Sequence, residues 1–249
     1  QSPIGKTPRS TVVSYLGIFD EIRMLFSKTS MAKELKLSPT MFSMNIKGGR
    51  CESCQGTGLQ KIELNYLPSA YITCPECNGR RYNEKIISVT YRNKTILDVL
   101  ETPIAEIIEI FNDTKKVYSV LRCMVELGLG YLTLGQMSMS LSGGEAQRIK
   151  LAKALGTLSR GKSLYILDEP TSGLNEIDID RFIKVLFSLQ NKGETILIIE
   201  HNIEFIAKVA DYIIDFGVYG GDLGGKIVAQ GKPRDVFAKK DSSLCGLDG

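Results

Sequence analysis

The sequence predicts an α/β fold in two parts: an N-terminal helical part with a small β-rich insert, and a C-terminal part built on a mostly parallel sheet. Three observations support this. After residue 141 apolar strands alternate with amphipathic helices, which is typical of a parallel sheet covered by helices. Residues 96–129 have helical apolar spacing. Between them and the N-terminus, four cysteines fall among short alternating segments that favour strands.

The N-terminal part, residues 1–140, is expected to be one helical domain with residues 41–92 as its insert. Residues 11–28 place apolar side chains at helical spacing, and Ser38-Pro39 then ends the pattern. Within and after the insert, the patterns predict strands at 41–46, 61–66 and 86–91, followed by about three helical pieces over 96–129.

The C-terminal part, residues 141–249, is expected to carry the chemistry. In sheets of this kind, functional residues lie at the carboxyl ends of the strands. The patterns predict strands at 164–167, 195–199 and 212–216, and helices at 177–189 and 203–209.

The composition is that of an ordinary globular protein, with 43% hydrophobic and 24% charged residues among 249. No run of about 18 apolar residues is present to cross a bilayer. The chain begins Gln-Ser-Pro-Ile-Gly, without an initiator Met or the pattern of a signal peptide. We therefore expect a soluble, cytoplasmic protein that does not act at a membrane and is cut from a longer chain.

Four of the six cysteines form two Cys-x-x-Cys pairs, which in a chain without a secretory segment favours a metal over disulfides. Four thiolates at this spacing predict a Zn²⁺ site, and four unpaired thiols are the alternative. Because such a site has no open position, the zinc is expected to be structural. The predicted ligands are Cys51, Cys54, Cys74 and Cys77; Cys123 and Cys245 receive no role.

Positive charge is concentrated in the part that carries these cysteines. Residues 1–92 hold 13 Lys and Arg against 7 Asp and Glu, a net +6, whereas the remainder is −3. A basic surface of this kind favours contact with nucleic-acid phosphates, although solvating charges give the same composition. The candidate phosphate contacts are Lys47, Arg50, Lys61, Arg80 and Arg81.

The segment Leu-Ser-Gly-Gly-Glu at 141–145 precedes a run with helical apolar spacing. Ser142 is suited to cap this helix, while Gly143 and Gly144 allow a phosphate to approach the free backbone N–H groups at its N-terminus. With Glu145, these residues predict a nucleotide contact.

An apolar strand at 164–167 is followed directly by Asp168 and Glu169. This is the Walker B arrangement, in which the Asp holds Mg²⁺ through its coordination shell and the Glu orients or deprotonates the attacking water. His201, the only histidine, follows the strand at 195–199 and is expected to reach the same γ-phosphate of ATP. The predicted catalytic residues are Glu169 and His201.

A run at 156–163 satisfies the phosphate-loop pattern G-x4-G-K-S letter for letter. A phosphate loop follows a strand and opens a helix, whereas this run follows a helix and opens a strand. We interpret it as a connection. The motifs together therefore predict an ABC-type P-loop ATPase fold that is partial, since it lacks the Walker A segment.

The order Leu-Ser-Gly-Gly-Glu, Leu-Asp-Glu-Pro, Ser-Gly-Leu-Asn and Glu-His is that of ABC ATPases, and the upstream cysteine pairs narrow the resemblance to the UvrA family of the ABC excinuclease. The chain resembles the C-terminal half of that family's members nearly end to end. The segments that carry the likeness are Gln1–Ser10, Lys47–Cys54, Gly128–Gln136, Ser163–Leu174 and Ile199–Asn202.

This resemblance implies several roles. Residues 1–140 would be the second signature domain, Gln1 would sense magnesium and γ-phosphate, and Lys6 and Arg9 would face DNA. The family forms homodimers, recognises distorted double-stranded DNA in nucleotide excision repair and the SOS response, loads the helicase UvrB, and departs after ATP hydrolysis. Asn175, Val218 and the tail after Phe237 depart from the family pattern, which leaves open a UvrA-like paralogue linked to drug resistance.

Two expectations concern mechanism. The motifs belong to two half-sites. Asp168, Glu169 and His201 serve one of them, while the Leu-Ser-Gly-Gly-Glu segment at 141–145 closes over a nucleotide held by another domain. Without the missing N-terminal part of the same protein, the chain is expected to hydrolyse ATP negligibly. The rival interpretation is a zinc-dependent DNA- or protein-binding module without ATPase activity, which accounts for residues 51–79 and for nothing after 141.

Overall fold

The computed structural model describes residues 4–5, 10–62, 70–156, 162–216, 224–239 and 244. The predicted site residues Gln1, Lys6 and Arg9 lie outside these ranges, as do Val218 and Cys245. The chain divides into two compact units, residues 1–160 and residues 161–249. The helix that begins in the Leu-Ser-Gly-Gly-Glu segment at 141–145, here called the signature segment, belongs to the first unit, so the domain boundary expected at residue 140 stays a prediction drawn from the motifs.

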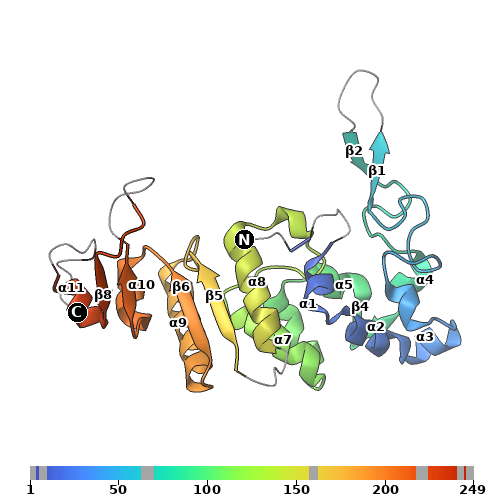
Figure 1. Ribbon diagram of the computed structural model, residues 1–249. Coiled ribbons are helices and arrows are strands. Elements are labelled where there is room, and N and C mark those ends of the chain that lie inside the picture. Colours follow the sequence, from blue (N-terminus) through green and yellow to red (C-terminus); the bar gives the residue numbers. More distant parts are fainter. Residues whose placement is uncertain are drawn as a thin grey trace. The chain divides into compact units, whose positions relative to one another are not determined.

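The first unit is mainly helical, as predicted (Figure 1). The segment at 11–28 forms two helices rather than one because Gly17, at φ 72°, ends the first in the left-handed region that glycine favours. The helices are α1 (Val12–Leu16), α2 (Phe19–Ser27), α3 (Ser30–Glu34), α5 (Ile96–Glu101), α6 (Ile104–Ile107), α7 (Lys115–Glu126) and α8 (Gly143–Gly156), with 3-10 turns η1 (Pro39–Phe42), η2 (Ile108–Phe111) and η3 (Ser138–Ser140).

Helices α7 and α8 pack side by side and hold much of the core of this unit (Figure 1). Val117, Val120, Leu121 and Met124 of α7 are buried, as are Ile149, Leu151 and Ala152 of α8. Gly156 allows the closest approach, because a Cβ there would lie 2.6 Å from Cα of Val120. Helix α8 ends at Gly156 and strand β5 begins at Leu164, which confirms the helix-to-strand context of the apparent phosphate loop.

The cysteine-bearing insert contains the hairpin β1 (Leu59–Ile62) and β2 (Ala70–Thr73), the short helix α4 (Glu84–Ile87) and the strand β3 (Thr90–Tyr91), which pairs with β4 (Lys94–Thr95) just beyond the insert. The described part of the strand expected at 61–66 is strand through Ile62, and its remainder lies outside the described residues.

Two predicted strands of the insert are wrong. Residues 41–46 are not a strand: the 3-10 turn η1 begins at Pro39, whose fixed φ suits the first position of a helical turn. Residues 86–91 are strand only at Thr90 and Tyr91. Before them, the side chain of Asn83 accepts a hydrogen bond from the N–H of Ile86 and caps helix α4.

The second unit has the predicted alternation of strands and helices. Strands β5 (Leu164–Asp168) and β6 (Thr195–Ile199) are parallel neighbours, with Asp168 paired to Ile199. Helix α9 (Glu176–Asn191) packs against β6 and against α10 (Ile203–Val209), where the rings of Phe182 and Phe205 stack at 6.0 Å. Strand β7 (Ile213–Asp215) pairs antiparallel with β8 (Ala229–Gly231), and α11 (Pro233–Phe237) packs against this pair.

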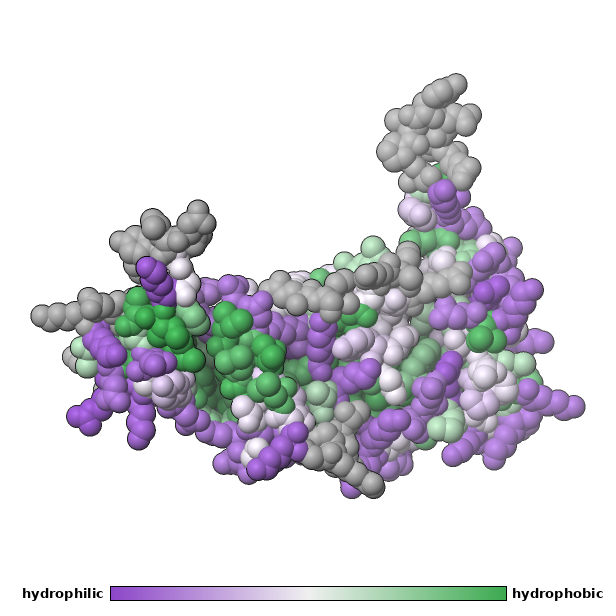
Figure 2. Space-filling view, viewed as in Figure 1, coloured by the Kyte–Doolittle hydropathy of each residue, from purple (hydrophilic) through white to green (hydrophobic). Residues whose placement is uncertain are grey.

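One face of the β5–β6 sheet is exposed and apolar. Leu164, Ile166, Leu197 and Ile199 alternate along the two strands, and each has at least half of its surface accessible, from 50% to 62%. Figure 2 shows hydrophobic side chains gathered over these strands. Apolar faces of this kind mark surfaces that another segment or partner covers. Among the described helices, none has the length and apolar character needed to cross a membrane.

Candidate functional site

The four predicted zinc ligands converge in the first unit. The sulfur atoms of Cys51, Cys54, Cys74 and Cys77 all lie within 4.8 Å of one another, and all four residues are buried. The Sγ atoms of Cys51 and Cys74 are 4.0 Å apart, and those of Cys54 and Cys77 are 3.7 Å apart. Zn–S bonds of about 2.3 Å in a tetrahedron place the sulfurs about 3.8 Å apart. The donor set therefore fits a four-thiolate zinc ion.

The two Cys-x-x-Cys turns have the same backbone form. The residue after each second cysteine and the glycine that follows it all have positive φ: 52° at Gln55, 80° at Gly56, 47° at Asn78 and 82° at Gly79. At Gly56 a Cβ would lie 1.7 Å from the carbonyl oxygen of Met44, so only glycine fits. The N–H of Gly58 donates to Sγ of Cys54 at 3.3 Å, which is how backbone N–H groups stabilise thiolate ligands.

The basic side chains of the insert are only partly available to a ligand. Arg50 pairs with Glu52 at 3.2 Å, and Arg80 pairs with Glu84 at 2.6 Å. Lys47 is exposed. The Arg80 pair is of the surface type that contributes about 0–1 kcal/mol, so a phosphate can replace Glu84 at little cost, whereas the Arg50 side chain is only 12% exposed and also donates to the carbonyl oxygen of Asn45. Lys47 is the candidate contact with fewest competing interactions.

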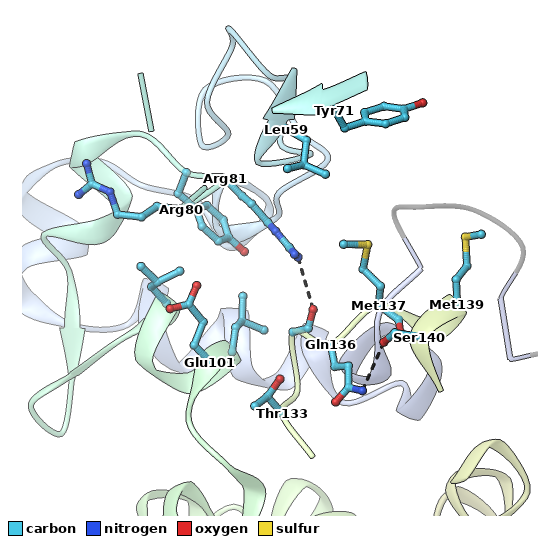
Figure 3. Close-up of a pocket in the computed structure, with 14 residues that line it drawn as sticks. Leu59, Tyr71, Arg80, Arg81, Glu101, Thr133, Gln136, Met137, Met139 and Ser140 are labelled. Carbon is cyan, nitrogen blue, oxygen red and sulfur yellow. Dashed lines mark hydrogen bonds between the residues drawn. The ribbon is translucent and has the colours of Figure 1, made fainter. Parts of the chain in front are cut away.

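A cavity of about 880 Å³ lies beside the cysteine site, lined mainly by apolar side chains such as Leu59, Tyr71 and Met137. Arg81 extends along it, and its Nη1 donates to the carbonyl oxygen of Gly135 at 3.4 Å (Figure 3). This contact links the insert to the helical part of the unit. Arg81 therefore has a structural partner, while its predicted contact with DNA stays a prediction.

The signature segment forms a reciprocal cap at the start of α8. The hydroxyl of Ser142 accepts a hydrogen bond from the N–H of Glu145 at 3.3 Å, and the carboxylate of Glu145 accepts one from the N–H of Ser142 at 2.7 Å. The predicted capping role of Ser142 is confirmed. Ser142 and Gly143 are exposed, and a Cβ at Gly143 would meet nothing within 4 Å. The helix N-terminus is thus open to an anion.

Tyr131 contributes to this cap, which sequence reasoning missed. Its hydroxyl donates to the second carboxylate oxygen of Glu145. Burial, together with this hydrogen bond, raises the pKa of Tyr131 to about 12. Burial also raises the pKa of Glu145, but the hydrogen bonds from Tyr131 and Ser142 lower it by more, and the net pKa is below its ordinary value. No local sequence pattern predicts the hydrogen bond between Tyr131 and Glu145, because these residues are 14 positions apart.

The carboxylates and the histidine meet in the second unit at the carboxyl ends of β5 and β6. Asp168 is the last residue of β5, and the N–H of Glu169 donates to the carbonyl oxygen of Ile199 at 2.8 Å. The Nδ1 atom of His201 lies 3.8 Å from a carboxylate oxygen of Glu169. Both side chains are accessible, 52% for Glu169 and 78% for His201. The arrangement can bind and polarise a small polar ligand.

Glu169 has φ 47°, in the left-handed region that non-glycine residues rarely adopt. Such a conformation costs about 1–3 kcal/mol and persists where surrounding contacts enforce it. Here the hydrogen bond from the N–H of Glu169 to the carbonyl oxygen of Ile199 holds the backbone, so the strained conformation lies at the residue whose carboxylate faces His201.

Sequence reasoning also missed Glu200 and Thr171. Glu200 stands between Ile199 and His201, and its carboxylate is only 2% exposed. It accepts hydrogen bonds from the N–H and the hydroxyl of Thr171. The alternating pattern of β6 hints that Glu200 faces inward, but not what it meets there.

The loop after the carboxylates ends at Asn175. The Oδ1 of Asn175 accepts the N–H of Asp178 at 2.9 Å and caps helix α9. Asn175 therefore has a local structural role, since Asn is among the strongest capping residues.

A parallel sheet with an Asp-Glu pair and a histidine at its carboxyl edge, together with a glycine-rich capped helix, defines an ATP-binding cassette. The family described as ABC transporter matches residues 22–172, more than half of the chain. The chain belongs to this family.

Individual relatives narrow the assignment. Over 242 residues, which make up 97% of the chain, it is 51% identical to the UvrABC system protein A of Staphylococcus aureus (strain COL) and 50% identical to that of Halalkalibacterium halodurans. The crystal structure of UvrA2 from Deinococcus radiodurans superposes with a TM-score of 0.86 at 44% identity and covers 97% of the chain. The chain spans 25% of the length of those curated relatives and 30% of the Deinococcus chain.

These similarities confirm the predicted resemblance to UvrA and the predicted ABC-type ATPase fold with a four-cysteine cluster.

Proposed function

We propose that the chain supplies the hydrolytic residues of one ABC ATPase site and the signature segment of another, within a UvrA-like protein that recognises DNA damage in nucleotide excision repair. The observation that carries this proposal is the placement of Glu169 and His201, 3.8 Å apart and accessible at the ends of neighbouring parallel strands. Few structural reasons exist for a strained, exposed carboxylate beside a histidine at this edge.

Each residue has a role that its position supports. Asp168 holds Mg²⁺ through its coordination shell, and Glu169 orients or deprotonates the water that attacks the γ-phosphate. His201 contacts the γ-phosphate from the neighbouring strand. Gln1, which lies outside the described residues, is proposed from the family resemblance alone to sense magnesium.

The signature segment acts on a different nucleotide. Ser142, Gly143 and Gly144 present a hydroxyl and free N–H groups at the N-terminus of α8, which suits the γ-phosphate of an ATP held by another domain. In this proposal the sequence has no phosphate loop in the correct context, so the chain alone hydrolyses ATP negligibly.

The apolar face of the β5–β6 sheet supports the same proposal. We expect the nucleotide-binding segment that completes the domain to pack on Leu164, Ile166, Leu197 and Ile199, which are 50% to 62% exposed. Homodimerisation and the loading of a UvrB-like helicase come from the resemblance.

DNA binding is assigned to the basic insert. Lys47 is exposed and is the first candidate contact, whereas Arg80 and the mostly buried Arg50 would each exchange an ion pair with a glutamate for a phosphate. The four thiolates fold the insert around zinc without taking part in chemistry. Lys6 and Arg9 are proposed as further contacts from the resemblance.

The ATPase proposal is tested in a chimera in which this chain replaces the matching segment of the Staphylococcus aureus relative. We expect ATP turnover in the chimera and a rate lower by about 10²-fold or more in Glu169→Gln. Glu204→Gln, on the exposed side of α10, is the matched control and should leave the rate unchanged. Robust ATP hydrolysis by the 249-residue chain alone that disappears in Glu169→Gln would refute the division into half-sites.

The DNA proposal is tested by gel shifts of the same chimera over a range of salt concentrations. Lys47→Ala should weaken binding to all sequences and reduce the slope of log affinity against log salt by about one. The control is Lys115→Ala, an exposed lysine at the start of α7. Equal slopes for the wild type and both variants contradict a phosphate contact at Lys47.

A further inference from the structure

Glu200 is the buried carboxylate of the Glu-His pair, in which the proposed contact with nucleotide falls to His201 alone. It follows strand β6 directly, and only 2% of its side chain is exposed, although the adjacent His201 is 78% exposed. Burying a carboxylate is unfavourable unless hydrogen-bond donors surround it. Its donors therefore indicate what it does.

The donors come from the segments that follow two different strands. One oxygen of Glu200 accepts hydrogen bonds from both the N–H of Thr171, at 3.2 Å, and the Thr171 hydroxyl. The other oxygen accepts the N–H of His201 at 2.9 Å and lies 3.6 Å from its Nδ1. A single carboxylate thus joins the segment after β5 to the segment after β6.

This arrangement requires a carboxylate rather than an amide. Both oxygens accept, and a glutamine at this position would direct its NH₂ group at a donor, either Thr171 or the N–H of His201. Two donors that face each other leave one unsatisfied in a buried place. Glu200→Gln therefore breaks the link with almost no change in volume.

We propose that Glu200 is a positioning residue for ATP hydrolysis, which fixes the backbone of His201 relative to the loop that begins at Thr171. This inference rests on the proposed ATPase function. The imidazole of His201 is mostly exposed, so protein packing around the ring restrains it little. The distance of 3.8 Å between Nδ1 of His201 and the carboxylate of Glu169 therefore depends on the backbone of His201, which is hydrogen-bonded to Glu200.

The link itself is tested on the 249-residue chain without any nucleotide. Because His201 is the only histidine, labelling with ¹⁵N-histidine gives a single backbone amide signal, whose hydrogen exchange reports the bond to Glu200. We expect exchange to be roughly fivefold to tenfold faster in Glu200→Gln than in the wild type, and unchanged in the control Glu204→Gln.

Two variants of Thr171 test the same link between Thr171, Glu200 and His201. Thr171→Val removes the hydroxyl and should also speed exchange at His201, because the two residues are connected through Glu200. Thr171→Ser keeps the hydroxyl and should restore the slow rate. Exchange at His201 that is the same in the wild type, Glu200→Gln and Thr171→Val would overturn the proposal.

The consequence for catalysis is tested in the chimera with the Staphylococcus aureus relative. Glu200→Gln should lower kcat at least about tenfold and leave KM for ATP within about twofold, since it affects the arrangement of the site more than substrate binding. An unchanged kcat in a chimera whose turnover depends on Glu169 refutes the positioning role. Turnover that does not depend on Glu169 refutes instead the function on which the role rests, while the exchange experiment still decides whether the link exists.

Discussion

Replacing Gly156 with alanine tests whether the α7–α8 contact is as close as the structure shows. The new Cβ would lie 2.6 Å from both Cα and Cγ2 of Val120, about 0.8 Å short of ordinary contact at 3.4 Å. Since one of these atoms is backbone, the helices themselves must move apart. Overpacking of this kind costs about 1–3 kcal/mol, and because Gly156 is the last residue of α8, the better helix propensity of alanine returns only about 0.5 kcal/mol. We expect a net destabilisation of about 0.5–2.5 kcal/mol.

The assay must report on the first unit alone, because a chain with two compact units need not unfold in one step. Hydrogen exchange of peptides from α7 and α8, followed by mass spectrometry over increasing urea, gives the local free energy of opening.

Gly143→Ala is the matched control on the same helix. A Cβ at Gly143 meets nothing within 4 Å, so this variant should be as stable as the wild type or slightly more so. Equal stability of Gly156→Ala and Gly143→Ala, or a more stable Gly156→Ala, would refute the packing described for α7 and α8.

The described contacts support four further predictions. Removal of the metal by a chelator should increase exchange in peptides of residues 51–82 while α9 keeps its protection; equal loss in both contradicts a local zinc role. Tyr82→Phe removes the bond from the buried hydroxyl to the carbonyl oxygen of Phe42 and should cost about 1–2 kcal/mol at neutral pH in urea denaturation. Burial raises the pKa of Tyr82 above its ordinary 10.0, so its contribution is complete below pH 10 and is lost as the pH rises, and the variant should lose less stability there. Asn175→Ala should destabilise α9 by about 1 kcal/mol, measured by exchange, whereas Asn175→Asp keeps the cap. The lowered pKa of Glu145 means that its contribution is present above its ordinary pKa of 4.5 and is lost as the pH falls; Tyr131→Phe should weaken this acid dependence in pH titrations of stability, and no change would contradict the hydrogen bond.

The second unit was predictable because its signals are periodic and local. Strands β5 and β6 are apolar runs bounded by polar residues, and Asp168 and Glu169 lie at the end of a strand that the sequence marks clearly. Cysteine spacing predicted the four-cysteine cluster for a similar reason, since two Cys-x-x-Cys turns leave few other arrangements for four buried sulfurs.

The insert was predicted less well because turn and cap chemistry prevailed over alternation. Pro39 starts a 3-10 turn where apolar residues suggested a strand, and Asn83 caps a helix inside another expected strand. Glu200 and Tyr131 were missed for a different reason. Their partners, Thr171 and Glu145, are distant in sequence, so only the fold brings them together.

The nucleotide retained by the chimera shows most directly whether this chain carries the residues that cleave ATP. After incubation with radiolabelled ATP and Mg²⁺, rapid removal of free nucleotide and chromatography identify what remains bound. We expect mainly ADP in the wild type and in Glu204→Gln, and mainly intact ATP in Glu169→Gln, because the bound substrate then lacks the carboxylate that activates water. Mainly ADP bound to Glu169→Gln, at the wild-type rate of formation, would contradict this role for Glu169.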